Sequence, residues 1–472
     1  MRADGGFHGF RPVPAVSPPV RWTAFRHTIS GLFAFDMSNL SLMRTILLAL
    51  SFSLLALRLP AQARGLKEQA LESFRQERYD EAVALMERAA EADPTDAESW
   101  YYLGFFSHYR AYDSRPLKGY DLSYSERVFS YLDRALELDP SLGDARYFYG
   151  AECSANAFHA MRERNLERLR HFYEKAFLKG AYPPWLLELG RNILDGCDRD
   201  AILFAGGNGD FDVCSYLQLH EGYRRDVSVL PIGYTDRPWY AGYLRDGLEG
   251  AQRPLALSLS DEQILEMRPF KWDTLEVRIP VSEALREEFS LPEDAVLTWT
   301  VEPDFASGRL NGKLNDEKAR PRTYLSPQRA VMLQIIEDNY ASRPIFFSRM
   351  GNPFFFAGLD RFFSHGGLVS RLLPFPTAGT AHETDVPRLE RLLRSDRLKE
   401  VRSVATTDIP RISGCLFVYT DALARLATRY RETGRKEELH ALAELYRRYL
   451  MPVLSSGEGD VLLEELEQAS GS

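Results

Sequence analysis

Residues 201–240 read AILFAGGNGDFDVCSYLQLHEGYRRDVSVLPIGYTDRPWY, and this stretch decides the fold. It opens on a short apolar run that ends in two glycines, as buried parallel strands do. A second strand is expected at 226–234, and a helix capped by Asp210 or Asp212 should run between the strands to Tyr223. Two strands joined in this way form a β-α-β unit with a right-handed crossover. The stretch therefore predicts an α/β domain.

The α/β pattern continues beyond this unit. A helix is predicted over 327–340, where Ser-Pro supplies the N-cap and the first helical position, and a third strand over 343–351. Alternating apolar residues in 275–281 and 295–301 predict a β-ribbon between the second and third strands. We therefore expect a Rossmann-like α/β domain over residues 196–375.

Residues 64–195 resemble tetratricopeptide repeats. Ala82 is a small residue where paired helices approach closely, and Pro94 stands where the pair should end. Pro140 repeats this end signal 46 residues later, about 12 more than the period of the family, which predicts an insertion over 109–124. Such pairs stack and leave a groove, so the resemblance implies a binding site for a protein or peptide. Alternatively, the stack only supports the next domain.

The chain is expected to be helical again after the α/β domain. Residues 422–452 read ALARLATRYRETGRKEELHALAELYRRYLMP, with apolar positions at helical spacing on both sides of Gly434. We expect a C-terminal helical region over 376–472 that is built around this helical hairpin. The predicted class is therefore α/β plus all-α.

The first 63 residues are predicted to lie outside the fold. Residues 43–63 contain an arginine, a 12-residue apolar stretch and an A-x-A end, which is the layout of a secretory signal peptide. Residues 1–42 are interpreted as a mis-assigned or disordered extension. Cleavage after Ala63 removes six arginines and two aspartates and changes the net charge from -9 to -13. We expect an exported, soluble protein of the periplasm or cell envelope, with no integral membrane segment after cleavage.

The central stretch also carries a family resemblance. It contains G-x-x-D, Y-L-Q-x-x-E-G, R-x-D-V and T-D-x-x-W-Y, and later R-P-I-x-F, G-L-D and G-L-x-x-R-L-x-P. In these motifs residues 185–455 are similar to the soluble part of large bacterial protein O-mannosyltransferase-like membrane proteins. The resemblance implies a periplasmic-side domain. The transmembrane helices of that family, where its transferase chemistry is expected, have no counterpart here, so transferase activity does not follow.

Polar and aromatic side chains gather where the predicted parallel strands end, which is the usual ligand-binding edge of an α/β domain. The candidate ligand-binding residues are Asn208, Asp210, Asp212, Asp236, Trp239, Tyr240 and Arg349. Carboxylates, an amide and aromatic rings suit a glycan or a peptide. A nucleotide phosphate in the loop GGNGDFD would face two carboxylates, so nucleotide binding is not expected. The alternative is structural: Asp210 and Asp212 cap a helix, Asp236 caps a turn and Trp239 packs in the core.

Most other chemistry lacks its sequence motif. The chain has no H-E-x-x-H, C-x-x-C, G-x-S-x-G or phosphate-loop string, so we predict no metal, no cofactor and no catalytic residue. The four cysteines are expected to be unpaired core residues. The acidic charge argues against a nucleic-acid partner. We expect a non-enzymatic scaffold that binds proteins through its repeats; the alternative is a carbohydrate-binding or glycan-processing protein that uses the α/β crevice.

Overall fold

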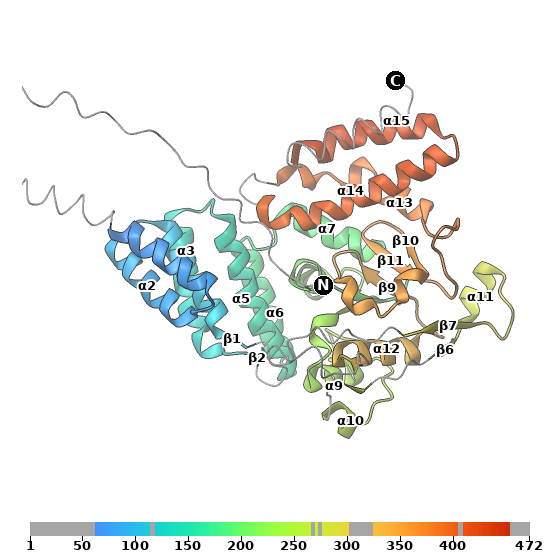
Figure 1. Ribbon diagram of the computed structural model, residues 1–472, viewed down its shortest axis with the longest axis horizontal. Helices are drawn as coiled ribbons and strands as arrows, with labels where there is room; N and C mark the ends of the chain where they lie inside the picture. Colours follow the sequence, from blue (N-terminus) through green and yellow to red (C-terminus); the bar gives the residue numbers. More distant parts are fainter. Residues whose placement is uncertain are drawn as a thin grey trace, which may run out of the picture.

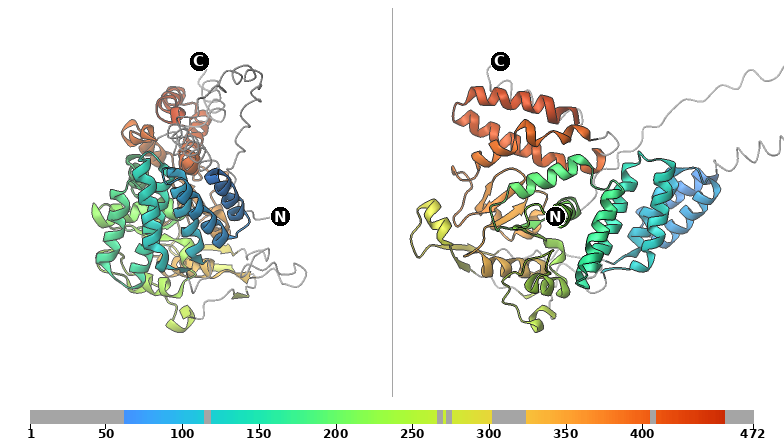
Figure 2. Two further views of the ribbon diagram at one scale, coloured as in Figure 1. Left: turned by 90° about the vertical axis from the view of Figure 1, so that its left-hand side faces the viewer. Right: turned by 180° about the vertical axis from the view of Figure 1, so that it is seen from behind.

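The computed structural model describes residues 62–113, 119–265, 270–271, 276–301, 324–404 and 409–453. The predicted extension (1–42) and nearly all of the predicted signal peptide (43–63) lie outside these residues, as does the end of the C-terminal region. Three parts follow one another along the chain: a stack of helices, a mixed α/β unit and a helical hairpin (Figures 1 and 2). The mixed α/β class is therefore confirmed.

The N-terminal stack consists of helices that pack in sequence order. Its members are a helix over 62–75, α2 (Tyr79–Ala92), α3 (Ala97–Ala111), α4 (Ser125–Leu138), α5 (Gly143–Arg162) and α6 (Leu166–Leu178). The next helix, α7 (Pro184–Asp195), packs against the α/β unit instead. Ala82 and Ala89 are fully buried, as close helix packing requires. A Cβ atom on Gly104 of α3 would lie only 2.7 Å from the side chain of Leu132 on α4, so glycine sets the spacing of these two helices.

An insertion was predicted over 109–124; α3 continues to Ala111, and a separate segment then joins α3 to α4. It contains a small antiparallel hairpin, β1 (Tyr112–Asp113) and β2 (Gly119–Tyr120), followed by a 3-10 turn over Leu122–Tyr124. Glu152 of α5 lies below this insertion and is fully buried. Its carboxylate is hydrogen-bonded to His108, Tyr120 and Ser125, so one polar side chain ties three separate elements to α5.

The central sheet has five strands in the order β10-β11-β9-β3-β4. Strands β3 (Ile202–Ala205), β4 (Ser228–Pro231) and β9 (Ile345–Ser348) are parallel and completely buried, which explains why they read as short apolar runs. All three were predicted. The sequence did not predict β10 (Phe363–His365) and β11 (Val369–Leu372), which extend the sheet beside β9 in antiparallel orientation and make it mixed.

Helices cover the sheet on both sides. In Figure 1, α13 (Val386–Leu392), α14 (Ile409–Glu432) and α15 (Lys436–Leu445) lie above it, next to α7. Below it lie α9 (Pro238–Asp246), α10 (Asp261–Leu265) and α12 (Pro327–Asn339). The remaining helix of the β-α-β unit, α8 (Val213–His220), contacts α7 and α6. The predicted hairpin of α14 and α15 turns at Gly434, whose φ of +70° favours glycine.

The predicted β-ribbon is also present. Strands β6 (Glu276–Pro280) and β7 (Val296–Thr300) pair antiparallel and carry α11 (Glu283–Phe289) between them. A second small pair joins β5 (Phe270–Lys271) to β8 (Tyr324–Leu325). Both pairs are separate from the central sheet.

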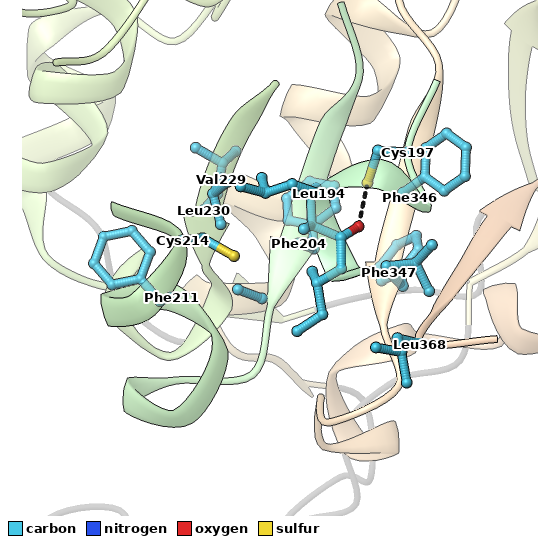
Figure 3. Close-up of a cluster of buried hydrophobic side chains, with 14 of the residues drawn as sticks. Leu194, Cys197, Phe204, Phe211, Cys214, Val229, Leu230, Phe346, Phe347 and Leu368 are labelled. Carbon is cyan, nitrogen blue, oxygen red and sulfur yellow. Dashed lines mark hydrogen bonds between the residues drawn. The ribbon is translucent and has the colours of Figure 1, made fainter. Parts of the chain in front are cut away.

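The core around the parallel strands is aromatic and deeply buried. Phe204 of β3 stacks on Phe347 of β9 with ring centroids 5.1 Å apart, and Leu230 of β4 is fully buried beside them (Figure 3). Cys197 and Cys214 lie on this core as free thiols, and the Cys197 thiol donates a hydrogen bond to the carbonyl of Ile193. All four cysteines are free in the structure, as the sequence analysis expects.

Candidate functional site

Asp210 folds back on the loop that carries it. The loop after β3 enters a π-helical turn over Asn208–Asp212, and the Asp210 carboxylate accepts hydrogen bonds from the backbone N–H groups of Gly206 (2.8 Å), Gly207 (2.9 Å) and Phe211 (2.9 Å). Only 1% of the residue is exposed. Asp210 is the third residue of this helical turn, and its bond to the N–H of Gly207, the N-cap residue, is that of a capping box, so Asp210 caps the turn that leads into α8 (Val213–His220). A ligand cannot reach a carboxylate that is this deeply buried.

Asp212 points away from the loop, toward the helical stack. It is 3% exposed, and its Oδ1 atom accepts hydrogen bonds from the hydroxyls of Ser154 on α5 (2.9 Å) and Tyr173 on α6 (3.4 Å). It makes no side-chain cap on α8, contrary to the structural alternative. Burial raises the pKa of this carboxyl to about 7, against the opposing effect of the two hydroxyl donors. Asp212 therefore joins the α/β unit to the stack through neutral partners.

Asp236 is held by two side chains. Its carboxylate pairs with Arg237 at 2.9 Å and accepts a 2.6 Å hydrogen bond from the amide of Gln328 on α12. Burial raises its pKa, and the neighbouring guanidinium of Arg237 opposes that shift. Because both of its oxygens are occupied by partners from the fold, Asp236 fixes the loop after β4 against α12.

Three of the predicted residues meet around Tyr234. The Tyr234 hydroxyl donates to the side-chain oxygen of Asn208 at 3.4 Å, and its ring lies 6.4 Å from that of Tyr240. Phe158 of α5 packs on this cluster, with centroids 4.2 Å from Tyr234 and 4.5 Å from Trp239. Tyr240 is buried, whereas Asn208 and Trp239 are partly exposed, as are Tyr234 and Phe158.

Arg349 belongs to a different group of side chains. It follows β9 and pairs at 2.8 Å with Asp421 of α14, which also pairs with Arg425 at 3.0 Å. Although burial opposes ionisation, these two guanidinium groups hold the pKa of Asp421 below its usual value. Arg349 therefore anchors the C-terminal hairpin to the sheet and does not join the Tyr234 cluster.

One pocket includes a predicted residue. It has a volume of about 420 Å³ and lies between α5, α9 and α10. Its lining consists of Arg162, Pro238, Trp239, Gly242, Asp261, Ile264 and Leu265. Sequence reasoning found Trp239 but missed Arg162 and Asp261, because only the fold brings these distant positions to one indole ring.

Two polar pockets lie at the opposite edge of the sheet, where β3 and β4 begin. The larger has a volume of about 610 Å³ and the smaller of about 390 Å³, and they share Asp195, Arg388 and Arg391. No sequence signal pointed to this edge, since ligand sites of parallel sheets are expected at the carboxyl ends of the strands. Arginines from two distant parts of the chain make up half of the lining of the larger pocket, and three arginines of one segment contribute to the smaller.

Two kinds of site are not found. In the part of the chain that the structure describes, no group of three or more histidine, cysteine, aspartate or glutamate residues could hold a metal ion. A helix of membrane-spanning length and hydropathy is likewise missing from the described ranges.

A known protein family matches a segment that begins within α7 and ends just after α11. Residues 187–291 match the family model of TMEM260-associated domain 2. The matched segment covers less than a quarter of the chain and agrees with the resemblance to O-mannosyltransferase-like proteins over the first part of the α/β unit. It contains every predicted site residue except Arg349. No curated protein and no solved structure matches the chain.

Proposed function

We propose that this chain is an exported, non-enzymatic scaffold protein that binds a protein partner through its helical stack. The supporting observation is the distribution of exposed apolar side chains. Five large apolar residues are exposed among those that the structure describes, and three of them lie on α5 and α6: Tyr147 (45%), Phe177 (38%) and Leu178 (73%). Apolar groups that gather on one element mark an interaction surface better than single scattered ones.

These three side chains lie at the same end of the helix pair. The start of α5 contacts the end of α6, since a Cβ atom on Gly180 would lie 2.9 Å from the side chain of Arg146. Phe177 also stacks on Tyr216 of α8, with ring centroids 4.8 Å apart. The exposed end of the pair therefore continues onto the α/β unit.

The stack is attached firmly to the α/β unit, which suits a scaffold. Asp212 receives hydrogen bonds from α5 and α6, and Arg164, just beyond α5, pairs with Asp246 at 2.8 Å and donates to the Gly247 carbonyl at 2.6 Å. Contacts at two separate places resist rotation of one part against the other. A partner bound to the stack would thus be held in a fixed orientation to the α/β unit.

Site-specific photo-cross-linking tests this proposal. A photoreactive residue at Leu178 is expected to give one adduct of defined mass in the cell envelope, and Leu178→Asp should abolish capture of the same partner. Phe417 on α14 is the matched control, because it is 62% exposed but lies on the C-terminal hairpin. Adducts of equal yield at both positions, or none at Leu178, would contradict a partner site on the stack.

A second candidate function is carbohydrate binding in the pocket beside Trp239. A partly exposed indole ring with a guanidinium and a carboxylate nearby offers a stacking surface and hydrogen-bonding groups for a sugar. Arg162 forms no ion pair with any described residue, whereas Asp261 pairs with Arg245 at 2.7 Å. This observation favours a glycan at the α9–α10 side, not at the buried aspartates.

Calorimetric titration with mannose oligosaccharides tests the second candidate. We expect Trp239→Leu to abolish any binding that the unmodified chain shows, since stacking on the indole is the main apolar contact that the pocket offers. Trp100→Leu on α3 is the control for loss of a tryptophan elsewhere. Unchanged binding by the Trp239 variant would exclude this pocket as the sugar site.

A further inference from the structure

The larger polar pocket at the amino ends of β3 and β4, named here the amino-edge pocket, is built from arginine and aspartate side chains. Its lining consists of Asp195, Cys197, Asp198, Arg199, Arg224, Asp226, Arg388 and Arg391. Its volume of about 610 Å³ falls in the range of sites that hold small molecules. No residue of this pocket takes part in the proposed functions above.

The aspartates of the pocket are all neutralised by partners within the fold. Asp226 pairs with Arg224 at 2.8 Å, and the hydrogen bond from that guanidinium lowers the pKa of Asp226 to about 2. Asp198 pairs with Arg388 at 2.5 Å and with Arg371 at 3.2 Å. These carboxylates are therefore already paired with arginines and do not form a cation site.

Asp195 is also fully paired within the fold. It pairs with Arg397 and accepts a 2.8 Å hydrogen bond from the hydroxyl of Tyr223. Arg224 also donates to the carbonyls of Leu194 (2.8 Å) and Asp198 (3.0 Å), which fixes the end of α7 at the pocket wall. The wall is thus rigid before any ligand arrives.

Two guanidinium groups remain after these pairings. Arg391 lies on α13 one turn beyond Arg388, is exposed, and forms no ion pair within the described ranges of the chain. Arg199 is 91% exposed and pairs with none of the pocket's aspartates; it forms a 3.6 Å ion pair with Asp200, whose carboxylate also pairs with Arg253 at 2.6 Å. The lining of the amino-edge pocket contains four arginines and three aspartates, a local charge of +1 in a chain of net charge -9, and Arg397, which pairs with Asp195, lies outside this lining.

We propose that the amino-edge pocket binds a phosphate-bearing small molecule, with Arg391 and Arg199 as its ligands. The net positive charge of the lining, with two arginines that pair with none of its aspartates, favours an anion such as a phosphate monoester. Guanidinium groups bind phosphate through pairs of parallel hydrogen bonds, and two of them can hold one phosphate from two directions. The pocket is too small, and has too few free cations, for a nucleic-acid backbone.

Isothermal titration of the full chain with inorganic phosphate and with glucose 1-phosphate tests this inference. We expect both probes to bind, with affinity that falls as sodium chloride rises from about 50 to about 200 mM. Arg391→Gln should weaken binding about tenfold or more, and Arg199→Gln with Arg391→Gln should abolish it. Both side chains are exposed, so neither change should lower the melting temperature.

Arg431→Gln is the matched control, because Arg431 is an exposed arginine of α14 with no ion pair among the described residues. This variant should bind both probes as the unmodified chain does. Tighter binding of the sugar phosphate than of inorganic phosphate would show that the rest of the pocket contacts the ligand. Absence of binding with both probes, unchanged binding by the double variant, or equal weakening by Arg431→Gln would overturn the proposal.

Discussion

Replacing Asp212 by asparagine is expected to raise the free energy of unfolding at pH 8 by up to about 4 kcal/mol. The carboxyl is buried between α5, α6 and the loop after β3, with only hydroxyl partners, so its ionisation is unfavourable in the folded state. Its pKa is about 7 in the folded protein against 3.8 for the free group, a difference of about three pH units at about 1.4 kcal/mol each.

The direction of the pH dependence follows from this difference. Because the folded-state pKa of Asp212 is raised, the neutral carboxyl contributes its full stabilisation to the unmodified chain below about pH 4. This part of the free energy of unfolding is lost progressively as the pH rises to about 7. The amide side chain of the variant carries no charge, so the variant should lack this slope. Denaturant unfolding of both chains at pH 4 to 8 measures this pH dependence as the difference between their free energies of unfolding.

The opposite change in stability would contradict this prediction. If the asparagine variant is less stable than the unmodified chain at pH 8, the ionised carboxylate is the form that Ser154 and Tyr173 stabilise. Asp212 would then hold the stack as a charged acceptor, and the contact between the two parts would weaken in acid.

Replacing Asp210 by alanine is expected to lower the free energy of unfolding by about 3 kcal/mol. The substitution removes the acceptor of three backbone N–H groups, and a buried donor left without a partner costs about 1–3 kcal/mol. Partial exposure of Gly206 and Gly207 lets water replace some of the loss. Thermal and denaturant unfolding measure the change.

Asp139→Ala is the control for this prediction. The Asp139 carboxylate also accepts a hydrogen bond from a backbone N–H, that of Ser141, but in an exposed turn, so we expect a loss of about 1 kcal/mol or less. If Asp210→Ala left stability unchanged while abolishing the binding of a glycan, Asp210 would be a ligand residue after all.

The elements that were predicted correctly are those whose signal is local. Strands β3, β4 and β9 read as apolar runs because they are buried on both faces, and α12 begins at its Ser-Pro signal. Strands β10 and β11 were missed because neither is buried along its whole length, and each becomes a strand through its antiparallel partner. Pairing of this kind depends on the tertiary fold and leaves little pattern in the sequence.

The same distinction applies to the candidate site. The sequence placed Asp210, Asp212 and Asp236 at the ends of strands, but it could not tell which way each carboxylate points. The structure turns Asp210 onto its own backbone and Asp212 toward the stack. Of the pocket arginines only Arg224 stood in a quoted motif, and the sequence could not place Arg388 there, since it meets Asp198 across 190 residues of chain.

The four free cysteines can report local unfolding of each part of the protein. One lies in each outer part, Cys153 in the stack and Cys415 in the hairpin, and two lie beside the sheet. Burial raises the pKa of every one of these thiols, so they react slowly while the fold is closed. The rate at which a thiol reagent modifies each cysteine would therefore measure how often that part opens. Equal rates would mean that the three parts open together, and unequal rates would reveal which part opens first.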